Sequence, residues 1–164
     1  MNAKVAHRVG LEGFEDIQFQ PVVLSDARGE NHTFHFRTHL FGTGVALDAF
    51  ELRNGDPFGY QFQVIGDPEA DLLALLGKLI EKIRRNISVK YIEDTEYGPH
   101  IVDSPGSRTR IQGMIDYDAD CLDDRIPRLV IDGRDITWAE FGRMLMTFEG
   151  WQFKLEILDK SDDP

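Results

Sequence analysis

The sequence predicts an α+β fold with a largely antiparallel sheet of about six to eight strands and two main helices. Short segments in which apolar and polar residues alternate lie between turn signals, a pattern typical of antiparallel strands. Two longer segments repeat apolar residues at spacings of three and four, as amphipathic helices do. At 164 residues, with 41% hydrophobic and 29% charged residues, the chain can bury a sizeable core.

The N-terminal half is expected to form an antiparallel meander. Residues 17–24 are its first strand, in which Pro21 must lie at an edge or a bulge because proline donates no hydrogen bond. Residues 33–40 and 45–53 form a hairpin around a glycine turn, and residues 58–65 follow as the next strand.

The hairpin has a predicted register. If Leu40 faces Val45, then Arg37 lies opposite Asp48 and forms a cross-strand ion pair with it. The same register places the aromatic side chains of the first strand beside the apolar residues of the second.

The first helix is expected over residues 67–86. Asp67 is a favourable N-cap, and Pro68 suits the first helical position because its missing N–H would have no partner there. An apolar stripe runs along the helix and should lie on the sheet. Its members are Leu72, Leu75, Leu76, Leu79, Ile80 and Ile83.

Further strands are expected over residues 88–93, 109–117 and 128–132. Residues 94–108 contain several glycines and prolines and show no periodicity, which indicates a long loop. Loops of this length are often binding segments.

The second helix is expected over residues 137–149. Thr137 and Glu140 have the spacing of a capping box, in which each side chain bonds the backbone of the other residue. Apolar side chains that include Trp138 should face the core. A closing strand is expected next, because apolar residues alternate along it. They are Trp151, Phe153, Leu155 and Ile157.

The chain is interpreted as one domain over residues 1–158 with a frayed acidic tail over residues 159–164. Eighteen basic against 29 acidic residues give a formal charge of −11, which opposes binding to nucleic acid. An acidic surface suits a basic protein partner or a cation.

Compartment and membrane association follow from other features. Cys121 is the only cysteine, so the chain has neither an internal disulfide nor a cysteine-based zinc site, and we expect the cytoplasm. No signal peptide is visible, and no run of about 18 apolar residues predicts a membrane span.

Residues 128–158 carry a family resemblance. Residues 130–145 (VIDGRDITWAEFGRML) and 149–157 (EGWQFKLEI) resemble the C-terminal segment of a family of uncharacterised prokaryotic proteins, a domain of unknown function. The resemblance implies no activity. Some relatives carry a cysteine-rich, zinc-ribbon-like segment before this domain, which a chain with only Cys121 lacks.

Candidate ligand-binding residues lie in two segments. His35, Arg37 and His39 share one face of a predicted strand. An ordinary solvated strand face is the favoured interpretation, and the alternative is that His35 and Arg37 bind an anion. His35 and His39 are about 13 Å apart on a strand, too far to share one metal ion. His100 and Arg108 lie in the predicted loop and complete the candidate set.

Asp116, Asp118 and Asp120 resemble the start of a calcium-binding loop, in which alternate carboxylates converge on the cation. Cys121 stands where that loop needs glycine, and Pro127 stands where it needs glutamate. We therefore expect a solvated acidic turn with at most adventitious cation binding, and no resident metal or cofactor.

No catalytic set assembles from these residues, so the favoured function is a non-catalytic protein-interaction or accessory domain. Its partner is another protein or a second copy of the chain. The alternative is a small enzyme or ligand-binding protein with a site between the His35/Arg37/His39 face and the loop of residues 94–108.

Overall fold

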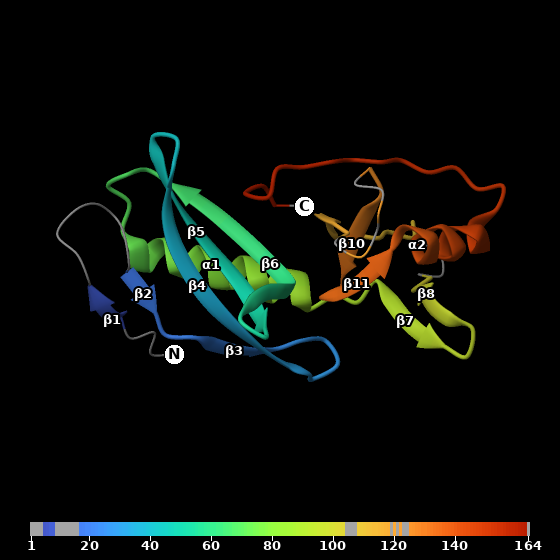
Figure 1. Cartoon of the computed structure of the whole chain (residues 1–164), viewed down its shortest axis with the longest axis horizontal. Helices are drawn as coiled ribbons and strands as arrows, with labels where there is room; N and C mark the ends of the chain where they lie inside the picture. Colours follow the sequence, from blue (N-terminus) through green and yellow to red (C-terminus); the bar gives the residue numbers. More distant parts are fainter. Residues whose placement is uncertain are drawn as a thin grey trace. The chain divides into compact units, whose positions relative to one another are not determined.

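The computed structural model describes residues 5–8, 17–103, 108–118, 120, 122 and 125–163 (Figure 1). The α+β class and the antiparallel pairing of the strands are confirmed. The chain divides into two compact units, unit 1 (Met1–Val89 and Leu158–Pro164) and unit 2 (Lys90–Ile157), where the sequence analysis expected a single domain. Each unit has its own apolar core.

Unit 1 is built on a four-stranded sheet in the order β3-β4-β5-β6. Its strands are β3 (Val22–Ser25), β4 (Asn31–Phe41), β5 (Gly44–Arg53) and β6 (Asp56–Gly66). A separate antiparallel pair comprises β1 (Val5–Arg8) and β2 (Ile17–Phe19). The strand predicted over residues 17–24 is therefore two strands, which Pro21 separates because it cannot continue the ladder.

The predicted register between β4 and β5 is confirmed. Leu40 lies opposite Val45, and Arg37 lies opposite Asp48. The Arg37 guanidinium donates to Asp48 Oδ2 at 3.0 Å, so the predicted ion pair also forms.

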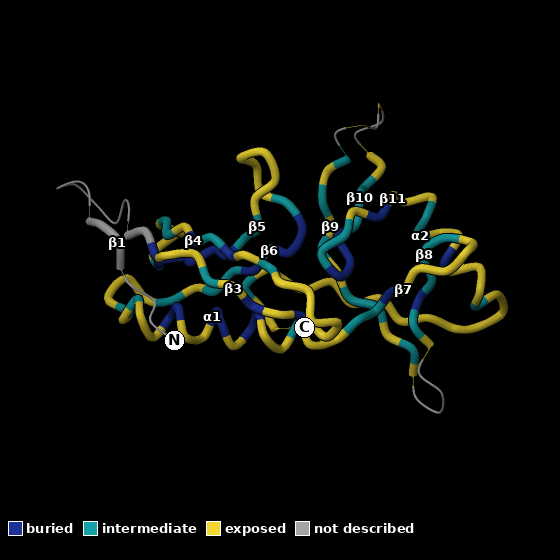
Figure 2. Tube along the Cα trace, turned by 90° about the horizontal axis from the view of Figure 1, so that it is seen from below, coloured by how far each residue is buried: buried dark blue, intermediate teal, exposed yellow. Residues whose placement is uncertain are grey.

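Helix α1 (Leu72–Ile87) packs its apolar stripe against one face of this sheet, and buried positions recur along it in Figure 2. The helix starts later than predicted. Asp71 is the N-cap and accepts the N–H of Leu73 at 2.9 Å, whereas the Asp67 carbonyl accepts the N–H of Ala70 in a preceding turn. The Asp-Pro pair at 67–68 initiates that turn, which such pairs also favour.

Unit 2 contains a hairpin and a three-stranded sheet. The hairpin pairs β7 (Ile92–Thr95) with β8 (Gly98–Ile101), and the sheet has the order β11-β10-β9. The strands of the sheet are β9 (Met114–Tyr117), β10 (Pro127–Ile131) and β11 (Arg134–Thr137).

Several boundaries predicted for unit 2 were wrong. Residues 92–101 form the hairpin, although the sequence analysis ended a strand at residue 93 and began the long loop at residue 94. Gly98, at a φ of 107°, supports its tight turn. Residues 104–107 of the predicted loop lie outside the described residues. The expected strand over residues 109–117 begins only at Met114.

Asp132 and Gly133 form the turn between β10 and β11, with φ angles of 51° and 71°. Positive φ at both positions is the requirement of the type I′ hairpin turn. The Asp132 carboxylate also accepts the N–H groups of Tyr91 and Ile92, at 2.8 and 2.9 Å. This one side chain therefore links the hairpin turn to the start of β7.

Helix α2 (Trp138–Leu145) continues into the short helix η1 (Met146–Phe148). The capping box is confirmed, since Glu140 accepts the N–H of Thr137 at 2.9 Å and donates its own N–H to Thr137 Oγ1 at 3.2 Å. The prediction that Trp138 belongs to the core was wrong, because its side chain is exposed. Neither α1 nor α2 has the length and apolar character needed to cross a bilayer.

The capping box predicts a pH dependence for unit 2. Hydrogen bonds from the backbone and the hydroxyl of Thr137 lower the pKa of Glu140 below its ordinary value of 4.5. The stabilisation that the Glu140 carboxylate provides is therefore present above pH 4.5. It is lost as the pH falls through the lower pKa that Glu140 has in the folded state. The difference in free energy of unfolding between wild type and Glu140→Gln, measured against pH, should shrink in acid. A difference that stays constant with pH would contradict this account.

Candidate functional site

Two side chains of the predicted basic face of β4, Arg37 and His39, contact the same buried carboxylate, that of Asp48. Arg37 and His39 lie 3.0 and 3.5 Å from Asp48 Oδ2. Gln63 donates to the other carboxylate oxygen of Asp48 at 2.8 Å. His35 stacks on Phe50, with their ring centroids 6.3 Å apart. The Arg37 guanidinium therefore balances the charge of Asp48, and both carboxylate oxygens accept a hydrogen bond.

The other candidate ligand-binding residues lie in unit 2. His100 is on β8, and Arg108 follows residues that are not described. The proposed cleft between these residues and the β4 face stays a prediction.

The acidic turn of unit 2 forms local contacts. Asp116 pairs with Arg128 at 3.5 Å, and Asp118 accepts the N–H of Asp120 at 3.2 Å. Among the described residues, these carboxylates do not converge as a set of metal ligands.

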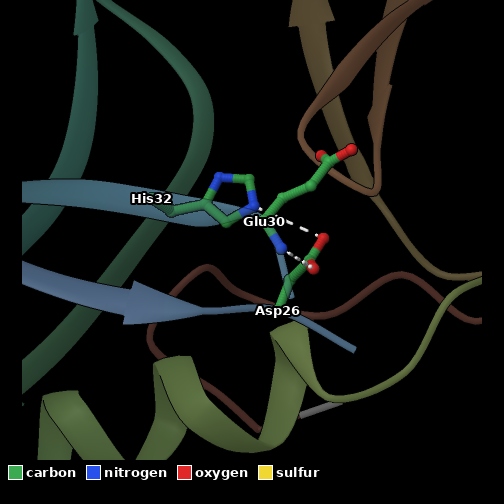
Figure 3. A group of neighbouring side chains, drawn as sticks. All are labelled: Asp26, Glu30 and His32. Atoms are coloured by element: carbon green, nitrogen blue, oxygen red, sulfur yellow. Dashed lines mark hydrogen bonds and ion pairs between the residues drawn. The ribbon is translucent and has the colours of Figure 1, made fainter. Parts of the chain in front are cut away.

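A different group converges at the turn between β3 and β4, which we call the hairpin cluster. It consists of Asp26, Glu30 and His32 (Figure 3). One ligand atom from each residue lies within 4.8 Å of the other two. The cluster contains imidazole and carboxylate donors, a combination that binds divalent transition metals.

Backbone contacts hold the turn that carries the cluster. Asp26 Oδ1 accepts the N–H groups of Arg28 and Glu30 at 2.8 and 3.0 Å. The N–H of Ala27 donates to the carbonyl of Ile87, the last residue of α1, at 3.0 Å. These contacts bury the Asp26 side chain completely and orient its second oxygen, Oδ2, towards His32.

The His32 ring is held on both sides. Its Nδ1 lies 2.9 Å from Glu51 Oε1, and Glu51 Oε2 accepts the N–H of Tyr60 at 2.9 Å. The ring also packs edge-on against Tyr60, with a centroid distance of 5.2 Å. Its Nε2 lies 3.4 Å from Asp26 Oδ2.

The hairpin cluster was not predicted, because the strand expected from residue 33 left His32 outside it. His32 is the second residue of β4. The sequence pattern that could have indicated it is the alternation along the strand. His32, Phe34 and Phe36 are alternate residues and so lie on the same face, and both phenylalanines are buried.

A second unusual feature follows α2, and we call residues 151–157 the apolar segment. The closing strand predicted there was wrong, because none of these residues is part of a strand and no described strand pairs with them. The segment runs as a long single trace in Figure 1. Its exposed fractions are 69% for Trp151, 89% for Phe153, 73% for Leu155 and 69% for Ile157.

The tail that follows the apolar segment is held on unit 1, where the sequence analysis expected a frayed end. The Lys82 ammonium lies within 3.1 Å of four backbone carbonyl oxygens. Three of them belong to the tail residues Lys160, Ser161 and Asp162. Arg85 adds an ion pair with Asp163 at 2.7 Å.

Large apolar side chains are more often exposed than buried among the described residues of unit 2. The exposed ones are Tyr97, Ile115, Tyr117, Leu122, Ile126, Trp138, Leu145, Met146, Trp151, Phe153, Leu155 and Ile157. The buried ones are Ile92, Ile101, Val130, Ile131, Ile136 and Met144. Four of these exposed side chains, Trp151, Phe153, Leu155 and Ile157, belong to the apolar segment.

Comparison with known proteins identifies two consecutive domains. Residues 15–88 match the family model of a domain of unknown function, DUF7686, and residues 89–162 match that of another, DUF7713. The resemblance of residues 128–158 to a domain of unknown function is thereby confirmed. The boundary between the two matches falls beside the division between the units. No curated protein and no solved structure matches the chain.

Proposed function

We propose that this chain of two domains of unknown function is a non-catalytic accessory protein, two copies of which associate through their apolar segments. One observation carries the proposal. Four large apolar side chains alternate along a segment that has no strand partner among the described residues, and all four are exposed. An extended segment that has no strand neighbours leaves backbone groups available for pairing with another chain.

Strand addition provides such a partner. A strand without neighbours presents a row of free N–H and C=O groups, which another extended chain can pair with. Alternate side chains then give the pairing its specificity. The apolar segment has one apolar face, and Gln152, Lys154 and Glu156 lie on its other face.

The charges of the segment favour a second copy of itself as the partner. In an antiparallel pair centred on Leu155, Lys154 of each copy lies opposite Glu156 of the other. Phe153 then lies opposite Ile157, a favourable pairing of an aromatic with a β-branched side chain. The two-fold symmetry repeats each of these contacts.

Neighbouring registers are less favourable. A pair centred on Lys154 places the two Lys154 side chains opposite each other, and a pair centred on Glu156 does the same with two carboxylates. Like charges in directly opposite positions destabilise a sheet. Self-pairing with Leu155 at the centre is therefore the specific arrangement that we propose.

A charge-swap experiment tests both the association and its register. Lys154→Glu and Glu156→Lys each replace two attractive pairs with two repulsive ones and should weaken dimerisation about 10–100-fold. The double variant Lys154→Glu/Glu156→Lys restores opposite charges and should recover dimerisation. Sedimentation equilibrium of the full chain measures the dissociation constants, and both side chains are exposed, so folding should be unaffected.

Leu155→Asp provides a stronger perturbation, because it places two carboxylates opposite each other at the centre and should abolish the dimer. Leu73→Asp is its matched control, since Leu73 is also an exposed leucine but lies on α1. A wild-type chain that stays monomeric at high concentration would overturn the proposal. A dimer that both Leu155→Asp and the single charge reversals leave intact would do the same.

A further inference from the structure

We propose that the hairpin cluster binds one Zn²⁺ ion through Asp26, Glu30 and His32. This inference is independent of the self-association, because the cluster lies in unit 1 and the apolar segment lies in unit 2. It depends on the spacing of the ligand atoms, the fixed orientation of His32 and the accessibility of Glu30.

The spacing of the two most buried ligand atoms suits a tetrahedral zinc ion. Zinc bonds to nitrogen and carboxylate oxygen are about 2.0–2.2 Å long, so two ligands of a tetrahedral ion lie about 3.3–3.6 Å apart. His32 Nε2 and Asp26 Oδ2 are 3.4 Å apart. This distance is long for a charge-assisted hydrogen bond, which is usually 2.7–2.9 Å.

The second nitrogen of His32 has the partner that metal-binding histidines usually have. Its Nδ1 lies 2.9 Å from Glu51 Oε1, and a proton donated along this contact leaves the Nε2 lone pair directed at the cluster. Nε2 is buried and has no hydrogen-bond partner among the described residues. Glu51 is itself oriented by the N–H of Tyr60, so the ring position is determined before a metal binds.

Glu30 supplies the third ligand from the exposed side of the cluster. Its side chain is exposed and can rotate, so its carboxylate can close on an ion that Asp26 and His32 already hold. Water can enter from the same side and complete a tetrahedral shell of three protein ligands.

The donor set favours zinc over the common alkaline-earth ions. Calcium takes six to eight oxygen ligands, and magnesium requires near-octahedral oxygen coordination. One imidazole and two carboxylates match neither requirement, whereas zinc readily binds this combination.

Calorimetric titration of the full chain with Zn²⁺, after removal of metals with a chelator, tests the inference. The expected result is one zinc ion per chain. Glu51→Gln should weaken binding about 10–100-fold, as the loss of the partner of a ligating histidine usually does. Glu30→Gln should weaken it at least 10-fold, and Glu93→Gln, an exposed glutamate at another hairpin, is the matched control.

X-ray absorption of the zinc-loaded chain should show nitrogen and oxygen ligands with one imidazole. Sulfur in the shell would assign the metal to Cys121 and overturn the inference. Absence of binding, or binding that Glu30→Gln and Glu51→Gln leave unchanged, would also overturn it. Substitutions at Asp26 or His32 could prevent folding, because both side chains are largely buried. Glu30 is exposed, so Glu30→Gln tests the site in a folded chain.

Discussion

Asp132→Ala is expected to destabilise unit 2 by about 3 kcal/mol or more. The buried Asp132 carboxylate accepts the N–H groups of Tyr91 and Ile92, and alanine would leave both donors without this acceptor. Residue 132 has a φ of 51°, in the left-handed region. Aspartate tolerates this conformation because its side chain forms local hydrogen bonds, which alanine cannot form. Because unit 2 has a small core, this loss should unfold much of its population.

Hydrogen exchange distinguishes this effect from a general loss of stability. In Asp132→Ala, the amides of unit 2 should lose protection while those of the α1 core in unit 1 retain theirs. Asp132→Asn is the matched control, because asparagine tolerates positive φ and keeps a side-chain oxygen acceptor. Equal stability of Asp132→Ala and Asp132→Asn would contradict the role assigned to the carboxylate.

Lys82→Ala is expected to release the tail and destabilise unit 1 by about 2–4 kcal/mol. The Lys82 side chain is almost completely buried, and burial lowers its pKa from 10.5 although Asp163 and Asp162 oppose the shift. Its four carbonyl contacts compensate for the burial of the charge. Alanine removes the donor from all four carbonyls and leaves a cavity beneath the tail.

Lys78→Ala is the control, since Lys78 is an exposed lysine one turn earlier on α1. Chemical denaturation measures the two changes in stability, and digestion with a carboxypeptidase measures release of the tail. Faster digestion is expected only for Lys82→Ala. If the two variants behave alike, Lys82 does not hold the tail.

Features that depend on neighbouring residues were accessible from the sequence. The pairing of Arg37 with Asp48 and the capping box of Thr137 and Glu140 were both predicted, and both form. The apolar stripe of α1 was also correct, although the first turn was not. Asp67 and Asp71 are both capable N-caps, and local chemistry alone does not decide between them.

The candidate sites were harder to predict from the sequence, because they depend on which residues distant in the sequence come into contact. Arg37 and His39 share a strand face, but the structure directs both towards Asp48. His32 belongs to a site only because β5 brings Glu51 to one side of its ring and the β3–β4 turn brings Asp26 to the other. Sequence spacing does not show that convergence.

The apolar segment shows the same limit most clearly. Alternation from Trp151 to Ile157 determines that the segment can be a strand, since apolar side chains then share one face. Whether it pairs within the chain depends on a free sheet edge at the right place, which is a property of the tertiary structure. The sequence by itself determined the local elements and the class of the fold. Only the tertiary structure decided that the chain has two cores, that Asp26, Glu30 and His32 meet, and that the apolar segment is left without a partner among the described residues.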